Sequence, residues 1–408
     1  MPESNEGVSR AQSGPHSLGG QADAFAVHLG ALGYAPLTIK GKLCFVRQLT
    51  RWMEAERLPA EDLVETLIDQ SLGLRRCTGD RRRTLLQFLD HLREEGVAPP
   101  REVPVDGSPV VKLEQRYARY LREERGLVDV TVVNYGGFVR RFLVEQFRQG
   151  PVELAGLTSR HVADFLLRHV RTMSPKRAQL MGCALRSFLR FLFLEAETTA
   201  DLSLAVPTVR QFRKITVPQY LAAADVERVV ASCDLAASVG RRDHAILLLL
   251  ARLGLRASEI VKLELGDLRW RDGELVVRGK GSLHDRLPLP KEVAKALALY
   301  LTRARATCSS RRVFLRMRAP LRGFTNSAAV TTIVERAIER AGLRPPHRGA
   351  HLFRHSLATG MIQHGASMAE IGQLLRHRSP NTTELYAKVD FEGLRGVSLT
   401  WVGAGGGR

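Results

Sequence analysis

Apolar side chains recur at helical spacing in three stretches of this chain, and connectors rich in proline and glycine separate the stretches. In the first stretch, over 21–100, one apolar stripe is formed by Phe25, Leu29 and Leu32. A second stripe over Leu85–Leu92 has the same three- and four-residue spacing. Residues at this spacing share one face of an α-helix, so the pattern predicts a small helical bundle.

The second stretch, over 108–202, carries similar stripes. Tyr117 and Tyr120 belong to one of them, and Leu185–Leu192 forms another. The pair Phe188-Leu189 stands in that stripe as Phe88-Leu89 stands in Leu85–Leu92. The similarity favours an internal duplication, although two unrelated amphipathic bundles would also carry such stripes.

The third stretch, over 219–396, is mixed. Asp243–Leu253 reads as a buried helix that ends at Gly254. A short β-hairpin is predicted from Gly273–Arg278 and Arg286–Leu289, which flank the loop 279–285. A third strand is predicted at Val313–Leu315. The sequence therefore predicts a mainly α-helical protein with one small antiparallel β-sheet.

The connecting segments differ in composition. Residues 1–20 and 397–408 are rich in glycine, with serine and proline added in the first, and predict flexible tails. The segment 1–20 has no apolar run, so we expect neither a signal peptide nor a transit sequence. The linker 203–218 carries Arg210, Arg213 and Lys214. It fits a basic strap along a phosphate backbone, and it equally fits an ordinary solvated connector.

Charge indicates the class of partner. Lys and Arg number 61 against 42 Asp and Glu, which gives a formal net charge of +19. Such a surface favours nucleic acid as the partner, although an arginine-rich composition that merely reflects a GC-rich genome would give the same total. No apolar run approaches the ~20 residues that span a bilayer, so we expect no membrane association. The 5 cysteines are scattered and never spaced C-x-x-C, which favours a reducing cytoplasm over a disulfide framework or a cysteine zinc site.

Two turns of the third stretch present cations. Arg256 lies in the turn Gly254-Leu255-Arg256-Ala257-Ser258-Glu259, where its guanidinium could grip two phosphate oxygens. Lys280 lies between two glycines at the end of the predicted hairpin, where bare backbone permits close approach of a ligand. Taken alone, each is more often an ordinary surface residue.

Histidine and arginine also share one helical face. His351, Arg354 and His355 are spaced i, i+3, i+4, so an imidazole and a guanidinium could serve an anionic substrate together. The alternative is a zinc ladder of His347, His351 and His355. Pro345-Pro346 argues against this ladder, because His347 should then precede the helix.

Two further residues follow the predicted capping box Ser367–Glu370. His377 comes at the end of the helix that this box begins, and Tyr386 comes nine residues later. A tyrosine at such a place is more often packed than nucleophilic, because a phenol with a pKa near 10 needs a base or cations to react at neutral pH.

Taken together, the six residues resemble the tyrosine recombinase (phage integrase) family, and in particular its Xer-like branch. The family carries an arginine in a G-L-R-x-S-E turn, a lysine in a G-K-G hairpin, H-x-L-R-H, a second histidine, and a tyrosine about nine residues later. The resemblance covers about Leu113–Val397, and this chain departs from it at Arg376, where the family often has glycine. All six positions are filled, by Arg256, Lys280, His351, Arg354, His377 and Tyr386.

The resemblance implies a mechanism. Tyr386 would attack a DNA phosphate to form a 3′-phosphotyrosyl bond and free a 5′-hydroxyl. Arg256, Arg354 and His377 would hold the nonbridging oxygens, with His351 as general base and Lys280 as general acid. His355 would be a helper without an assigned step. The chemistry needs no cofactor and no metal.

The resemblance also implies an architecture and partners. The second stretch would be a SAM-like core-binding domain and the third an α+β catalytic domain, while 21–100 would be an additional SAM-like domain that contacts DNA or a neighbouring protomer. We expect double-stranded DNA recombination sites, a homotetramer in which Phe391–Val397 packs on another subunit, and possible use of a partner recombinase. The alternatives are a type IB topoisomerase, a catalytically silent DNA-binding relative and, remotely, a zinc hydrolase.

Overall fold

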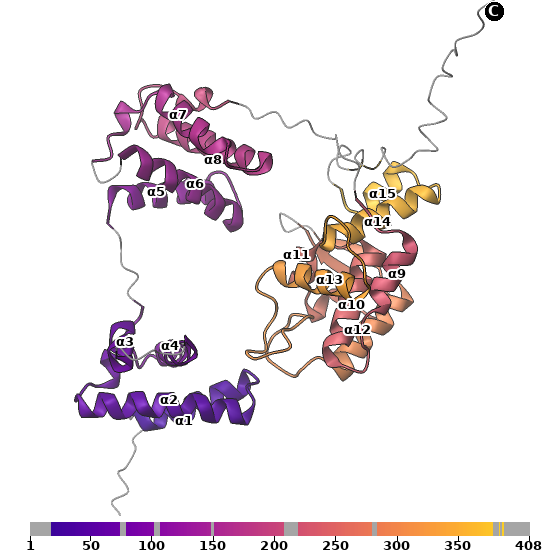
Figure 1. Ribbon diagram of the computed structural model, residues 1–408, viewed down its shortest axis with the longest axis horizontal. Helices are drawn as coiled ribbons and strands as arrows, with labels where there is room; N and C mark the ends of the chain where they lie inside the picture. The colour runs from indigo at the N-terminus through magenta and orange to yellow at the C-terminus, as the bar shows by residue number, and fades with distance from the viewer. Residues whose placement is uncertain are drawn as a thin grey trace, which may run out of the picture. The chain divides into compact units, whose positions relative to one another are not determined.

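The computed structural model describes residues 18–73, 79–101, 107–147, 151–207, 219–279 and 284–377, together with Thr383 and Tyr386. Within these residues, three large hydrophobic cores form from consecutive parts of the chain. We refer to the parts as the N-terminal unit (18–101), the middle unit (107–207) and the C-terminal unit (219–386), and describe each by itself (Figure 1).

The N-terminal unit is a helical bundle, as the stripes predict. The rings of Phe25 and Phe88 meet edge to face at 5.2 Å between centroids inside its core. Helix α1 begins at Leu18, inside the predicted tail 1–20, because Ala22 already packs into this core at 4% exposure. The helices are α1 (Leu18–Ala31), α2 (Pro36–Ala55), α3 (Glu65–Leu72) and α4 (Gly79–Glu94), with a 3-10 turn η1 (Ala60–Asp62).

The middle unit is a second helical bundle. Tyr117 packs edge to face on Phe188 at 5.1 Å between ring centroids. Val206 is 4% exposed in the same core, so the first residues of the predicted linker 203–218 are packed, whereas 208–218 lie outside the described residues. The helices are α5 (Pro109–Glu123), α6 (Asp129–Phe147), α7 (Ser159–Val170) and α8 (Pro175–Leu194), with 3-10 turns η2 (Leu154–Gly156) and η3 (Leu202–Ala205).

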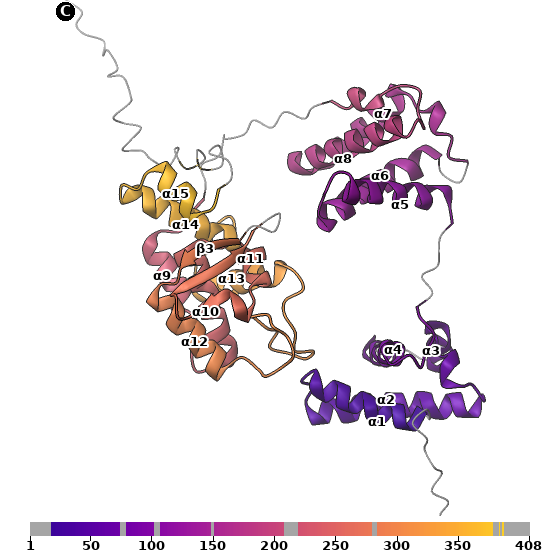
Figure 2. The same ribbon diagram turned by 180° about the vertical axis from the view of Figure 1, so that it is seen from behind.

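The C-terminal unit is built around the predicted buried helix, α10. Its residues Ile246–Leu250 are completely buried, because α9, α12 and α14 pack around it. Figures 1 and 2 show these helices together with the small sheet. The helices are α9 (Ala223–Ala231), α10 (Ser238–Leu253), α11 (Ala257–Lys262), α12 (Lys291–Arg303), α13 (Ala328–Arg340), α14 (Ala350–Gln363) and α15 (Met368–Leu374), with a 3-10 turn η4 (Leu265–Asp267).

The sheet has three antiparallel strands in the order β1-β2-β3. They are β1 (Leu268–Arg269), β2 (Glu274–Arg278) and β3 (His284–Pro288), and Leu275 pairs with both Leu268 and Leu287. The predicted hairpin is therefore present, but its second strand begins two residues before Arg286 because His284 already pairs with Arg278.

The third strand is not the one predicted from the sequence. Val313–Leu315 lies in a buried loop, in which Leu315 forms only an isolated β-bridge with Gly323. The Val313 N–H donates to the Leu263 carbonyl, and the Leu315 N–H donates to the Tyr300 hydroxyl. These three side chains are at most 1% exposed, so the apolar run indicated burial and not a continuous strand. Among the described helices, none is long and apolar enough to cross a membrane.

Candidate active site

The predicted turn after α10 positions the first arginine. Gly254 adopts φ +56°, the left-handed conformation in which glycine commonly ends a helix, and Arg256 then occupies the N-cap of α11. The Glu259 carboxylate accepts the Arg256 backbone N–H at 2.7 Å and its Nη1 at 2.8 Å. The Arg256 side chain is 38% exposed, so it is tethered at one side and open to solvent at another.

A second arginine shares the same carboxylate. Arg376 Nη2 donates to Glu259 Oε2 at 2.9 Å, and both side chains are at most 7% exposed. Burial raises the pKa of Glu259, but the Arg376 and Arg256 guanidiniums outweigh it and hold that pKa below its ordinary value. Arg376 stands where the family often has glycine, and its φ of +54° is a conformation that glycine adopts without strain.

Arg354 projects from α14 into the same region. It is 3% exposed, and its guanidinium donates to the backbone carbonyls of Gly254 and Leu375. These two bonds connect α14 to the Arg256 turn and to the end of α15. Burial lowers the pKa of Arg354 to about 10, with a further contribution from the neighbouring arginines, so the group stays charged at neutral pH.

The Tyr386 hydroxyl reaches this cluster. Its side chain packs with Ala358, Ile371 and Leu375 in a small hydrophobic cluster and is 2% exposed. The hydroxyl lies 2.8 Å from His355 Nδ1. Burial raises the pKa of Tyr386, whereas Arg354 and Arg256 act in the opposite direction, so both guanidiniums are within electrostatic reach of the phenol.

His377 lies against the same ring. The two aromatic planes are parallel within 1° at 6.3 Å between centroids, and His377 Nδ1 lies 2.7 Å from the Thr383 hydroxyl. Burial, together with Arg354, lowers the pKa of His377 to about 4; burial likewise lowers the pKa of His355 to about 4. Both imidazoles are therefore neutral at pH 7. When Thr383 donates to Nδ1, the His377 proton is on Nε2 and is available to an anion.

The other two predicted residues are His351 and Lys280. His351 is exposed one turn before His355 on α14, with ring centroids 6.3 Å apart. Lys280 lies outside the described residues, two positions beyond the end of β2 at Arg278. The structure thus brings four of the six predicted side chains together, and His351 borders them.

The histidine ladder proposed as an alternative does not form on one helix. Helix α14 begins at Ala350, so His347 precedes it, as Pro345-Pro346 predicts.

Sequence reasoning did not assign a role to three residues that position this cluster. Glu259 was present in the motif around Arg256, and Arg376 was noticed only as a departure from glycine. Thr383 carried no signal, because only the fold brings its hydroxyl to His377.

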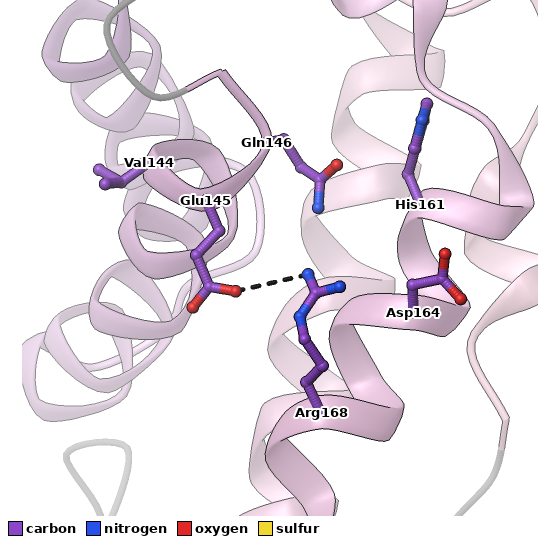
Figure 3. Close-up of a pocket in the computed structure, with 6 residues that line it drawn as sticks. All are labelled: Val144, Glu145, Gln146, His161, Asp164 and Arg168. Atoms are coloured by element: carbon purple, nitrogen blue, oxygen red, sulfur yellow. Dashed lines mark hydrogen bonds and ion pairs between the residues drawn. The ribbon is translucent and has the colours of Figure 1, made fainter.

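A cavity of about 530 Å³ lies elsewhere, on the middle unit between α6 and α7. Figure 3 shows Glu145 facing Arg168 across it, near His161 and Asp164. Glu145 also contacts His169 Nε2 at 2.7 Å, so its charge is already engaged within this unit. None of the six predicted residues belongs to the cavity.

Comparisons with known proteins match both the C-terminal and the middle unit. Residues 219–392 match the phage integrase family, and 115–196 match the phage integrase N-terminal SAM-like domain. A Sinorhizobium fredii protein whose name describes it as an integrase/recombinase is 38% identical over 97% of each chain. The tyrosine recombinase XerD of Corynebacterium glutamicum is 30% identical over 72% of this chain and 97% of its own.

Solved structures share the fold. The XerH site-specific recombinase, crystallised with palindromic difH substrate as a post-cleavage complex, has a TM-score of 0.55 at 17% identity over 95% of each chain. A lambda integrase dimer bound to a COC′ core site has a TM-score of 0.51 at 17% identity, over 80% of this chain and 91% of its own.

Proposed function

The chain belongs to the phage integrase family of tyrosine recombinases, and we propose that it breaks and rejoins DNA at specific sites through a covalent bond between Tyr386 and a 3′-phosphate. The Tyr386 oxygen attacks phosphorus, the P–O bond to the 5′-oxygen breaks, and attack by a 5′-hydroxyl reverses the step. Because the phosphotyrosyl bond replaces the phosphodiester bond, no high-energy cofactor is required.

The observation that carries this proposal is the neighbourhood of the Tyr386 hydroxyl. Side chains more than a hundred positions apart in the sequence meet there: the phenol experiences the charges of Arg256 and Arg354, and its ring lies parallel to that of His377. A phosphate group bound by two guanidiniums would lie close to the nucleophile. A tyrosine that only fills the core would not require two guanidiniums and an imidazole around its hydroxyl.

Charge stabilisation is the role we assign to Arg256, Arg354 and His377. Negative charge increases on the nonbridging oxygens as the phosphorus becomes five-coordinate, and each preorganised donor in such a site typically contributes about 3–4 kcal/mol. Arg354 is held by two backbone carbonyls and Arg256 by Glu259, so both guanidiniums are oriented before DNA binds. We assign Glu259 and Arg376 the role of positioning residues.

Two proton transfers complete the step. We assign His351 as the general base that accepts the proton of Tyr386, and Lys280 as the general acid that protonates the leaving 5′-oxygen. His355 contacts the phenol directly, at 2.8 Å, and is neutral at pH 7, so we assign it the orientation of the hydroxyl before attack.

Double-stranded DNA recombination sites are the partners that we infer, bound by a homotetramer, with a partner recombinase as a possible addition. The charge distribution supports contact with phosphates by the later part of the chain. Residues 219–396 hold 29 Lys and Arg against 17 Asp and Glu, whereas 18–101 hold 12 against 11. The names of the relatives favour recombination over relaxation of supercoils or a silent role.

Trapping the covalent intermediate tests the proposal. The substrate is a library of nicked duplexes with randomised arms. On cleavage, the short strand piece between the cut and the nick, which carries the new 5′-hydroxyl, dissociates, so the cleaved strand cannot be rejoined. Wild type should yield an adduct that survives denaturation, and sequencing the captured strands should reveal one common site. Tyr386→Phe should yield none, while Tyr220→Phe, at a tyrosine that is 40% exposed and remote in sequence, should behave as wild type. An adduct formed by Tyr386→Phe would overturn the assignment.

A further inference from the structure

A group of potential metal ligands lies in the N-terminal unit, which contains none of the six residues assigned to the recombinase site. His28 lies in the last turn of α1, and His91 and Glu94 are spaced i, i+3 near the end of α4, so both face the same side of that helix. One ligand atom from each of the three residues lies within 4.8 Å of the other two. The two helices therefore bring two imidazoles and one carboxylate together.

His91 is the unusual member of this group. It is 5% exposed, and neither of its ring nitrogens has a hydrogen-bond partner among the described residues. Its aromatic neighbours are Phe25, at 5.5 Å between ring centroids, and His28, at 4.7 Å. A buried polar atom without a partner typically costs about 1–3 kcal/mol, and nearly all such atoms in folded proteins find one. The imidazole therefore lacks a partner that any of the described residues supplies, and an external ligand would satisfy it.

Packing alone gives no reason for a histidine here. The neighbouring core position Phe88 shows that an aromatic hydrocarbon fits between α1 and α4. A histidine at position 91 gives up apolar surface and adds two polar nitrogens, so a function for those nitrogens is the simpler explanation.

We propose that His28, His91 and Glu94 bind one divalent cation of the zinc class and that the ion joins α1 to α4. Two imidazoles and a carboxylate are a common donor set for zinc, and Glu94 is exposed, so water can take the fourth position. Zinc–ligand bonds of about 2.0–2.2 Å place tetrahedral ligand atoms about 3.4 Å apart. The observed ligand atoms lie within 4.8 Å of one another, so side-chain rotations that move these atoms by about an ångström bring them to that spacing.

The ion would be structural. The group lies in the N-terminal unit and contains none of the residues assigned to DNA cleavage. An ion that bridges the end of α1 and the end of α4 would stabilise this unit in proportion to its occupancy, because the ligands are brought together only when the unit is folded. Recombination chemistry itself would not require the metal.

Cobalt binding tests the proposal directly. The full chain, stripped with a chelator and dialysed at pH 7, is titrated with Co²⁺ and then with Zn²⁺. We expect one equivalent of Co²⁺ to give the visible absorption of a tetrahedral site, Zn²⁺ to displace it, and either ion to raise the unfolding temperature of the N-terminal unit. His91→Phe should weaken the affinity at least about 100-fold. Glu94→Gln changes an exposed side chain and leaves folding intact, so its weaker binding separates loss of a ligand from loss of structure.

A matched control uses a second pair of neighbouring histidines among the described residues. His351 and His355 lie 6.3 Å apart between ring centroids on α14 and could also take up metal. His351→Gln should leave the cobalt spectrum and stoichiometry unchanged. The proposal is refuted if wild type shows no tetrahedral absorption, if Glu94→Gln and His91→Phe bind as wild type does, or if His351→Gln removes the signal. The proposed role of Tyr386 is tested independently, because that experiment measures a covalent DNA adduct and not metal binding.

Discussion

Replacing Glu259 with glutamine removes the one carboxylate that two arginines of the candidate active site share. The substitution keeps the size of the side chain and one acceptor oxygen. It leaves Arg376, at 7% exposure, with only the longer contact to Asp285 at 3.8 Å, and it removes the negative charge that tethers Arg256. The charges of Arg256, Arg354 and Arg376 then lose their buried anion, and the remaining carboxylate, Asp285, is 44% exposed.

The structure sets the expected size of the effect. Breaking a buried ion pair by removing one partner typically costs 3–5 kcal/mol, because an uncompensated charge stays buried. Arg256 is 38% exposed and glutamine can still accept one hydrogen bond, so we expect a cost at or just below the lower end of that range, about 2–3 kcal/mol. At 1.4 kcal/mol for each factor of ten, this is about 30- to 150-fold in the opening equilibrium of the C-terminal unit.

Hydrogen exchange measured by mass spectrometry is the suitable assay, because a chain with several cores has no single unfolding free energy. Amides of α10 should exchange about 30- to 150-fold faster in Glu259→Gln, while those of α8 in the middle unit should not change. Glu292→Gln is the matched control: Glu292 also pairs with an arginine, Arg252, but is 51% exposed, so the change should stay under about fivefold. Equal effects of the two substitutions would refute the reasoning from burial.

The pH dependence gives a second readout of the same carboxylate. The pKa of Glu259 is lower in the folded chain than in the unfolded chain, so the unfolded chain binds a proton more readily. The stability that the charged carboxylate contributes is complete above its ordinary pKa of 4.5 and is lost as the pH falls through the lower, folded value. The α10 amides of Glu259→Gln should lack this component of acid sensitivity. An unchanged acid profile would exclude Glu259 as its source.

Two further predictions concern the same region. Gly254→Ala should slow cleavage of nicked DNA and speed hydrogen exchange of α10 amides. A Cβ at φ +56° would lie 2.7 Å from Leu375 Cδ2 and would disturb the backbone carbonyl that Arg354 contacts. Cleavage by Gly254→Ala at the wild-type rate would contradict this. His355 has a folded pKa of about 4 against 6.5, so the unfolded chain takes up the proton first and stability should fall between pH 6.5 and 4. In His355→Gln, hydrogen exchange measured at pH 4.5 and 7 should show a smaller loss of stability at the lower pH. A loss as large as in wild type would exclude the His355 imidazole as its source.

Sequence patterns predicted the helical parts well, because helical periodicity and core packing act in the same direction. The stripe that contains Leu185 and Phe188 is completely buried in α8. Periodicity failed where burial occurs without regular structure. Val313–Leu315 is as apolar as a central strand, yet hydrogen bonds from distant residues hold it as a loop. A short apolar run reports that a segment is inside, and only pairing partners decide whether it is a strand.

The candidate site was predictable in its residue types but not in its contacts. Spacing placed His351, Arg354 and His355 on one helical face, yet it could not show that His355, and not His351, meets the Tyr386 hydroxyl. That contact depends on where residue 386 returns to α14, which local sequence does not encode. The same limit applies to Thr383, which contacts His377 from six positions further along the chain.

Arg376 shows why a departure from a family pattern is best judged together with its neighbours. An L-residue at φ +54° costs about 1–2 kcal/mol relative to glycine, so the substitution alone is unfavourable. A buried ion pair with Glu259 at 2.9 Å offsets that cost, and Glu259 in turn holds Arg256. The arginine is therefore tolerated only while the carboxylate is present, and the two positions form one unit with the Arg256 turn. Exchange of Arg376 for glycine would consequently matter less in Glu259→Gln than in wild type, since the partner that gives Arg376 its value is already gone.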